Sequence, residues 1–415
     1  MEKAKPFCIS KHAVWEAYKR VKANDGAAGV DGQTIENFEE DIGNNLYKIW
    51  NRMSSGSYLP PPVKRVEIPK DNGAGVRPLG IPTVADRVAQ TVVKDYLEPI
   101  LDACFHVDSY GYRPHKSAKE ALAISRVRCW KYDWLLKLDI RSFFDNLDHS
   151  LLLRALRHHT DCNWVLLYVE RWLKAPVQME DGTLVSRDKG SPQGGVVSPL
   201  LSNLFLHYTF DRWMQRHYPD VPFERFADDA ICHCATLEQA EQLRAALMQR
   251  FADCHLELHP QKTRVIYCKD DDRRGDYSDH SFDFLGYTFR PRRSKNRWGK
   301  HFISFTPAVS NKAAKAIRRT LRGWSLPKRS DKSLEDLARM FNPVIQGWIN
   351  YYASFYKSAL YPTLRHIDWQ LGLWAERKFK KLRRHSRRAR HWLARVAKTR
   401  PRLFAHWKFV QPMAG

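Results

Sequence analysis

The stretch Leu135–Asp145, with the sequence LLKLDIRSFFD, places a single acidic residue at the end of an apolar run. The mostly apolar run from Trp134 to Ile140 predicts a buried strand. Asp139 would then lie where the strand leaves the core, and a bulky aromatic pair follows it. An aspartate at the end of a strand is most often only a turn residue, so this stretch alone leaves a structural role open.

A second acidic stretch, Arg225–Ile231 or RFADDAI, sets two adjacent aspartates between apolar halves. The pattern from Phe223 to Cys234 predicts a hairpin whose turn lifts Asp228 and Asp229 out of the core. Nucleotidyl transfer by two divalent cations needs two or three carboxylates at one point, with the oxygen ligands that Mg²⁺ prefers. The two stretches together, in this order and about ninety residues apart, are far more specific than either one alone.

The two acidic stretches resemble motifs A and C of reverse transcriptases. The second is similar to the Tyr-Ala-Asp-Asp box, with Phe226 in place of the tyrosine. This difference keeps the aromatic ring and loses one hydroxyl, so we expect activity to persist. The resemblance implies that Asp139, Asp228 and Asp229 are catalytic and that these residues, together with Ile140, hold Mg²⁺.

Further blocks of the same family follow in order along the chain. Lys64–Lys70 and Arg77–Pro82 resemble the fingers block, in which Arg77 would grip the incoming triphosphate and Lys70 would assist, because cationic side chains suit phosphate oxygens. A solvated basic hairpin stays open as the alternative for the first basic residues of this block. The other assignments that the resemblance implies are Arg113 within Ser109–Pro114, beside the template path and bound to nucleic acid; Phe144, the steric gate against ribonucleotides; Gln193 within Lys189–Gly195, near the nucleotide; and Lys262 within Leu258–Thr263, a catalytic residue by the phosphates.

The C-terminal part of the chain and one early loop narrow the resemblance. Asn342–Tyr352 is similar to the thumb, or maturase X, domain of bacterial group II intron-encoded reverse transcriptases, and Gly29–Gly32 favours that class over retroviral enzymes. Many relatives carry a C-terminal HNH nuclease with cysteine pairs, whereas this chain has no cysteine after Cys268. We therefore expect a form without that nuclease, which does not cut target DNA itself.

The charge of the chain points to a polyanionic partner. It has 69 Lys and Arg against 45 Asp and Glu, a net charge of +24, and much of the excess lies in residues 376–415. A basic segment at a membrane surface would need a clean apolar face, which this tail lacks. Trp392 and Trp407 are interleaved with the basic residues, which suits phosphate contact with stacking. The residues expected to bind nucleic acid are Arg383, Arg384, Arg387 and Arg388.

The expected elements predict an α+β fold rather than a regular alternation of strands and helices. The resemblance implies a right-hand polymerase. We expect a helical N-terminal extension at 1–60, fingers and palm at 61–303, a helical thumb or maturase X domain at 304–375, and a basic DNA-binding segment at 376–415. Within the thumb, one helical apolar stripe is expected from Leu334, Leu337, Phe341, Val344, Trp348, Tyr351 and Phe355.

The leading interpretation is an RNA-directed DNA polymerase that binds its intron RNA and assists splicing and mobility. Its partners would be the group II intron RNA, an RNA template with a DNA primer, target DNA and deoxynucleoside triphosphates. Two alternatives stay open: a related reverse transcriptase recruited to antiviral defence or a CRISPR locus, and an RNA-binding splicing factor with a vestigial polymerase. Scattered cysteines and the lack of a long apolar segment favour a cytoplasmic protein without membrane contact, and a homodimer is left open.

Overall fold

The computed structural model describes residues 5–69 and 75–412. The chain forms two compact units, Met1–Ala121 with Trp134–Val265, and Leu122–Asp133 with Ile266–Gly415. The mixed α+β character is as expected. The helices expected as an N-terminal extension belong to the first unit, and the expected thumb and basic segment share the second. Within the described ranges, no helix is both long and apolar enough to cross a membrane.

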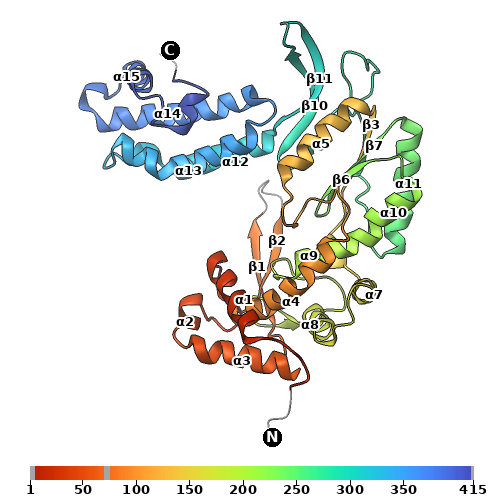
Figure 1. Ribbon diagram of the computed structural model, residues 1–415. Helices are drawn as coiled ribbons and strands as arrows, with labels where there is room; N and C mark the ends of the chain where they lie inside the picture. Colours follow the sequence, from red (N-terminus) through yellow and green to blue (C-terminus); the bar gives the residue numbers. More distant parts are fainter. Residues whose placement is uncertain (1–4, 70–74, 413–415) are drawn as a thin grey trace. The chain divides into compact units, whose positions relative to one another are not determined.

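Three helices open the first unit (Figure 1). They are α1 (Lys11–Asn24), α2 (Ile35–Glu39) and α3 (Ile42–Ser55). The hydroxyl of Thr34 caps α2, as helix starts require. Val14, Tyr18 and Val21 recur at helical spacing along α1, and all three are buried. The helix α1 packs on α3 and on the long helix α4 (Val84–Asp102).

Two four-stranded sheets form the framework of the first unit. One has the order β2-β1-β4-β5 and the other the order β6-β7-β3-β8. The acidic hairpin expected from Phe223 to Cys234 is confirmed, since it forms two paired strands. The strands are β1 (Val63–Pro69), β2 (Val76–Ile81), β3 (Trp134–Leu138), β4 (Val177–Gln178), β5 (Leu184–Val185), β6 (Phe223–Phe226), β7 (Asp229–Cys234) and β8 (Arg264–Tyr267).

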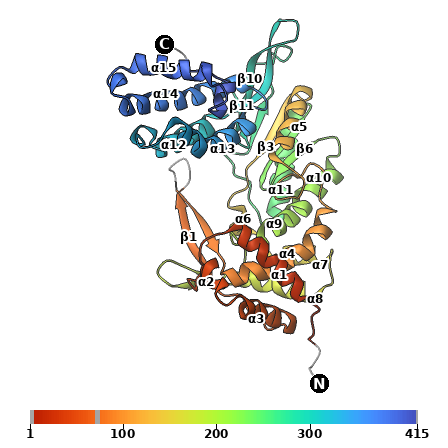
Figure 2. The same ribbon diagram turned by 60° about the vertical axis from the view of Figure 1, so that its left-hand side comes forward.

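Helices pack around these sheets. In particular, α11 (Leu237–Asp253) lies against β3 and β7, as Figure 2 shows. One long helical segment is built from α9, a π-helical turn η1 and α10, which follow each other directly. The remaining elements of the first unit are α6 (Phe143–Asn146), α7 (His149–Arg157), α8 (Asn163–Lys174), α9 (Ser198–Leu206), η1 (His207–Asp211) and α10 (Arg212–His217), whereas most of α5 (Ala118–Lys131) belongs to the second unit.

The second unit joins a three-stranded sheet of order β11-β10-β9 to a group of helices. The helical region expected from 304 begins only at Asn311, because β11 pairs with β10 along its whole length and ends at Val309. The elements are β9 (Phe282–Phe284), β10 (Tyr287–Lys295), β11 (His301–Val309), α12 (Asn311–Gly323), η2 (Leu326–Lys328), α13 (Leu334–Tyr352), η3 (Lys357–Leu360), α14 (Tyr361–Lys378), η4 (Lys380–Leu382), α15 (Ser386–Thr399) and η5 (Ala405–Lys408).

The expected apolar stripe of α13 is only partly right. Leu334, Leu337 and Phe341 are buried, but Val344 is 43% exposed. After Pro343 the buried face continues instead through Ile345 and Ile349, which the stripe omitted. Both faces of this helix carry apolar residues at helical spacing, so the pattern alone does not select the buried one.

The basic tail is part of the helical core of the second unit and is not an appended segment. Leu393 of α15 and the ring of Trp407 are 1% exposed and belong to one apolar cluster with residues of α12, α13 and α14. Asp368 of α14 accepts hydrogen bonds from Trp407 Nε1 at 2.9 Å and pairs with His406 at 2.8 Å. The expectation that 376–415 stands apart is therefore corrected: its apolar residues complete the helical core.

Candidate active site

Asp139 directly follows β3, one residue beyond the last strand residue, Leu138. The strand pairs with β7, where Leu138 lies opposite Ala230. The peptide of Asp139 is fixed on both sides: its N–H donates to Thr263 Oγ1 at 3.3 Å, and its carbonyl accepts from the His259 N–H at 2.7 Å. The backbone that carries this carboxylate is thus held between the hairpin and the loop before β8.

The second acidic stretch forms a tight turn between β6 and β7, with Phe226 opposite Asp229. Ala227 adopts a left-handed conformation with φ of 56°, which an L-residue keeps only where the surroundings enforce it. The enforcing residue is Arg225, which is 1% exposed. Its guanidinium makes two bonds of 2.7 Å to the Asp211 carboxylate and donates to the Ala227 carbonyl at 3.0 Å.

The loop after α4 supports the same turn from the other side. The Tyr110 N–H donates to the Arg225 carbonyl at 2.8 Å, and the Gly111 carbonyl accepts from Asn203 Nδ2 at 2.7 Å. A Cβ atom on Gly111 would lie 2.9 Å from the carbonyl carbon of Phe226 and closer still to the Ala227 nitrogen. Only glycine therefore allows the two backbones to approach this closely.

A cavity of about 590 Å³ opens beside these acidic residues within the first unit. It brings together most of the residues that the sequence analysis assigned to chemistry and to the nucleotide, although these come from widely separated segments. The assigned residues that line it are Arg77, Asp139, Ile140, Phe144, Gln193, Asp228 and Lys262.

The loop Lys189–Gly195 connects two walls of this cavity. The Gly80 N–H of β2 donates to the Gln193 carbonyl at 2.7 Å, and Gly194 packs directly on the Gly80 carbonyl with φ of 121°. The Ser191 N–H donates to the Phe144 carbonyl at 2.7 Å. These bonds tie the strand of Arg77 to the aromatic pair that follows Asp139.

The two aromatic residues of this pair have different environments. Phe143 is 2% exposed and belongs to the core, whereas Phe144 is partly exposed. Their rings meet edge to face, with centroids 5.3 Å apart. Phe144 is therefore the ring that is free to meet a ligand in the cavity, which supports its expected role over that of Phe143.

The electrostatics of the site favour a cation near the acidic residues. Lys262 Nζ lies 3.6 Å from Asp139, and Lys137 Nζ lies 3.8 Å from Asp229. Burial raises the pKa of Asp228, and the charge of Asp139 adds to this rise. Burial also raises the pKa of Asp229 to about 6, while Lys137 opposes the shift. Carboxylates crowded in this way are costly to ionise unless positive charge joins them.

The donor set of the cavity fits a divalent cation. Within 5–69 and 75–412, no three His, Cys, Asp or Glu side chains form a ready metal-binding group. Asp139 and Asp228 nevertheless both line the cavity beside Ile140, and all three can offer oxygen atoms. Mg²⁺ commonly takes one or two protein carboxylates and completes its shell with water and substrate phosphates. Asp139, Ile140 and Asp228 are therefore the residues that could hold it.

Some expected site residues do not line the cavity. Asp229 faces Lys137, and Lys70 lies outside the described residues. The expectation that Arg113 contacts nucleic acid is not met. Its side chain is only 7% exposed, and its guanidinium donates to the Asp102 carboxylate at 2.6 Å and to carbonyls of the same loop. The four expected arginines of the tail are exposed, but they belong to the second unit.

Three residues of the site were not assigned from the sequence. Tyr112 lines the cavity with φ of 56° and is 52% exposed. Lys137 forms an ion pair with Asp229, and Arg225 holds the turn that carries Asp228. All three lie within quoted motif stretches, so the signal was present. Their roles depend on where the side chains point, which the motif does not state.

Comparison with known proteins identifies the family of the chain. Residues 68–289 match the model of the reverse transcriptase (RNA-dependent DNA polymerase) family, and residues 314–392 match the group II intron maturase-specific domain. The chain is 29% identical to protein YkfC of Escherichia coli over 69% of its own length and 81% of that protein. It is 34% identical to the group II intron-encoded protein LtrA of Lactococcus lactis over 48% of its length, which covers only 33% of LtrA.

Proposed function

Because this chain belongs to the reverse transcriptase family, in its group II intron type with a maturase domain, we propose that it copies RNA into DNA at the cavity around Asp139 and Asp228. The observation that carries the proposal is the convergence of both acidic motifs, Arg77, Phe144 and Lys262 on one cavity. Its size, about 590 Å³, is in the range of sites for single small ligands such as a nucleoside triphosphate.

Each wall of the cavity has a distinct task in this proposal. Arg77 and Lys262 both line the cavity with the acidic residues and would hold the triphosphate oxygens, for which cationic donors are suited. The partly exposed ring of Phe144 would exclude a 2′-hydroxyl by steric overlap. Gln193 is held by its backbone bond to Gly80 and would contact the nucleotide from the loop that joins the walls.

Asp139, Asp228 and the Ile140 carbonyl would hold Mg²⁺, with Asp229 as the further acid of the motif. When bound, the ions supply charge neutralisation on the phosphates and a lower pKa for the primer 3′-hydroxyl. The residues of this chain orient the reacting groups: Arg225 fixes the turn of Asp228, and Thr263 with His259 fixes the peptide of Asp139. Lys137 holds Asp229 in place as a positioning residue.

We also propose that the second unit and the basic tail bind intron RNA and target DNA, and that the first unit provides the fingers and palm of a right-hand polymerase. The maturase-specific match ends within α15, and the exposed side chains of Arg383, Arg384, Arg387 and Arg388 lie at the end of this region. In the described ranges no carboxylate pairs with these four, so their charge is available to phosphates. Binding should therefore weaken steeply with salt.

The test is primer extension on an RNA template by the Asp228→Asn variant. We expect loss of at least a hundredfold in rate, with RNA affinity within about twofold of wild type, because the lost group does chemistry and basic surface supplies affinity. Asp220→Asn is the matched control, since Asp220 is exposed in the same unit and lines no part of the cavity. Extension by Asp228→Asn at near the wild-type rate would overturn the proposal.

A further inference from the structure

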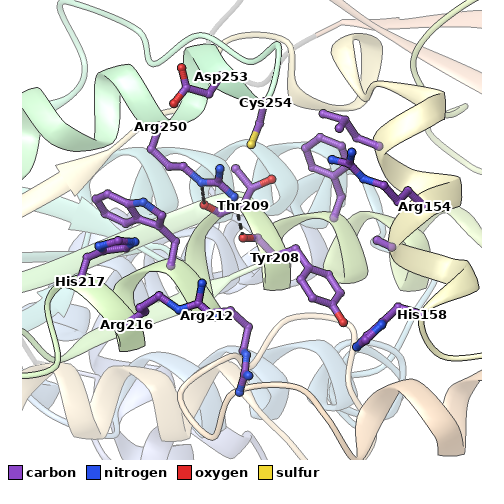
Figure 3. Close-up of a pocket in the computed structure, with 14 residues that line it drawn as sticks. Arg154, His158, Tyr208, Thr209, Arg212, Arg216, His217, Arg250, Asp253 and Cys254 are labelled. Atoms are coloured by element: carbon purple, nitrogen blue, oxygen red, sulfur yellow. Dashed lines mark hydrogen bonds between the residues drawn. The ribbon is translucent and has the colours of Figure 1, made fainter.

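A second cavity of the first unit, about 700 Å³ in volume, shares no lining residue with the proposed active site. It lies between α7, the continuous helical segment α9-η1-α10 and α11, and Figure 3 shows the side chains that surround it. The lining is rich in basic and aromatic groups, and Asp253 is its only carboxylate among the described residues. Cavities of this size are normally built for a ligand rather than left as packing faults.

Three arginines give the cavity its charge. Arg154 comes from α7, and Arg212 and Arg216 lie four residues apart on α10, so that they share one helix face. All three are exposed, and among the described residues no hydrogen bond or ion pair engages their guanidinium groups. Asp253, in contrast, already accepts a hydrogen bond from Gln249 at 2.8 Å. The cavity therefore presents uncompensated positive charge to any ligand.

The fourth arginine builds the cavity instead of facing it. Arg250 of α11 donates from Nε to the Thr209 carbonyl at 3.1 Å and from a terminal nitrogen to the Tyr208 carbonyl at 3.0 Å. Both carbonyls belong to the π-helical turn η1, where wider winding alters the regular helix bonds. These bonds, drawn in Figure 3, lock α11 to the long helical segment and keep the walls apart.

Aromatic rings complete the lining. Trp213 is partly buried and lies against His217, with ring centroids 5.1 Å apart. Tyr208 is held by its hydroxyl, which bonds His159 at 2.8 Å, and its ring faces His158 at 6.1 Å. Flat rings beside free guanidinium groups are the features by which proteins bind unstacked bases together with their phosphates.

We propose that this cavity binds a nucleotide of single-stranded RNA, with its base against Trp213 and its phosphates on Arg154, Arg212 and Arg216. The inference goes beyond the proposed polymerase site, and it rests on the proposed RNA binding for the choice of RNA over a free nucleotide. A base and a phosphate together use both kinds of lining, whereas a simple anion would leave the rings without a role. The protein would thus hold an RNA strand at a cavity distinct from the one proposed for primer extension.

The experiment cross-links single-stranded RNA that contains 4-thiouridine to the full chain and identifies the modified peptides by mass spectrometry. We expect an adduct within Tyr208–His217. The triple variant Arg154→Ala, Arg212→Ala, Arg216→Ala should lose this adduct and should flatten the salt dependence of RNA binding by about two units, at roughly 0.7 per phosphate contact. Trp213→Leu should weaken binding about fivefold or more through lost stacking.

The matched control replaces Arg157, Lys174 and Arg244 by alanine, which removes the same charge from the same unit without touching the cavity. It should keep the adduct. No adduct in wild type, or equal loss in both triple variants, would overturn the inference. If millimolar ATP abolishes the adduct while an unlabelled RNA oligonucleotide does not, the RNA assignment is wrong and the ligand is a free nucleotide. Primer extension, measured in parallel, separates failure of this cavity from failure of the proposed polymerase.

Discussion

Replacement of Gly111 by alanine should misplace the catalytic turn without removing any group that binds substrate. Gly111 packs on the turn between β6 and β7, and its carbonyl is held by Asn203. An added Cβ would lie 2.9 Å from the Phe226 carbonyl carbon, and nearer still to the Ala227 nitrogen, where about 3.4 Å is the ordinary limit. Because both neighbours are backbone atoms, no side-chain rotation can relieve the overlap.

The turn must therefore move by at least half an ångström, and Asp228 moves with it. Active sites lose about a hundredfold in rate for a misplacement of roughly 1 Å, so we expect extension to slow by about ten- to a hundredfold. Overpacking of this kind also costs about 1–3 kcal/mol of stability. A folded but slow enzyme is therefore the expected product at moderate temperature.

The assay is single-turnover addition of one deoxynucleotide to a primer annealed to RNA, with thermal unfolding measured on the same sample. Gly43→Ala is the control, since Gly43 lies in α3 and an added Cβ would meet nothing within 4 Å. This control should keep the wild-type rate and gain slightly in helix stability. A Gly111→Ala rate within threefold of wild type would refute the argument that this glycine positions Asp228.

Three further predictions follow from the described contacts. Phe144→Ala should raise the use of ribonucleotides relative to deoxyribonucleotides, and unchanged selectivity in a steady-state competition assay would exclude this ring as the gate. Phe143→Ala should instead mainly lower the unfolding free energy, by about 3–5 kcal/mol. Trp407→Ala should lower the unfolding free energy by about 3–5 kcal/mol, because Trp407 fills the core of the second unit. Arg388→Ala should lower it by less than about 0.5 kcal/mol, because Arg388 is exposed. Equal effects of the two variants in urea titrations would contradict the conclusion that the tail belongs to this core. Burial alone would raise the pKa of Asp148, but hydrogen bonds from Ser150, the α7 backbone and a histidine lower it to about 2. The ionised carboxylate therefore stabilises the folded protein above about pH 4, and this stabilisation is lost as the pH falls toward 2. Asp148→Asn should remove about 2 kcal/mol of the acid dependence of the unfolding free energy, and an unchanged pH profile would argue against this hydrogen-bond network.

Local patterns were sufficient for much of the fold. The run before Asp139 is a strand because all but one of its residues are apolar and buried, and aromatic residues at both ends of β6 mark the strand before Asp228. Caps are equally local, as Ser333 and Asp336 show by forming a capping box at the start of α13. Such features depend on neighbours within a few residues, so the order of amino acids determines them directly.

The surroundings of a charged side chain, in contrast, depend on segments far away in the chain. Arg77 and Arg113 both precede a proline in a family block, yet one lines the cavity and the other is taken up by Asp102 and nearby carbonyls. Likewise, the tail has the composition of a solvated basic segment, but Trp407 completes a core supplied by α13 and α14. No local pattern records these contacts.

The sequence by itself therefore determined the family of the chain, the acidic residues proposed to carry its chemistry and the expectation of a polyanionic partner. The tertiary structure decided which of two adjacent phenylalanines at the cavity is the more exposed, which arginines have no carboxylate partner, and that three arginines from α7 and α10 line a second cavity. The physical reason is that residue type and spacing fix what a side chain can do, whereas burial and pairing are set by long-range packing, which brings together residues that the chain keeps far apart.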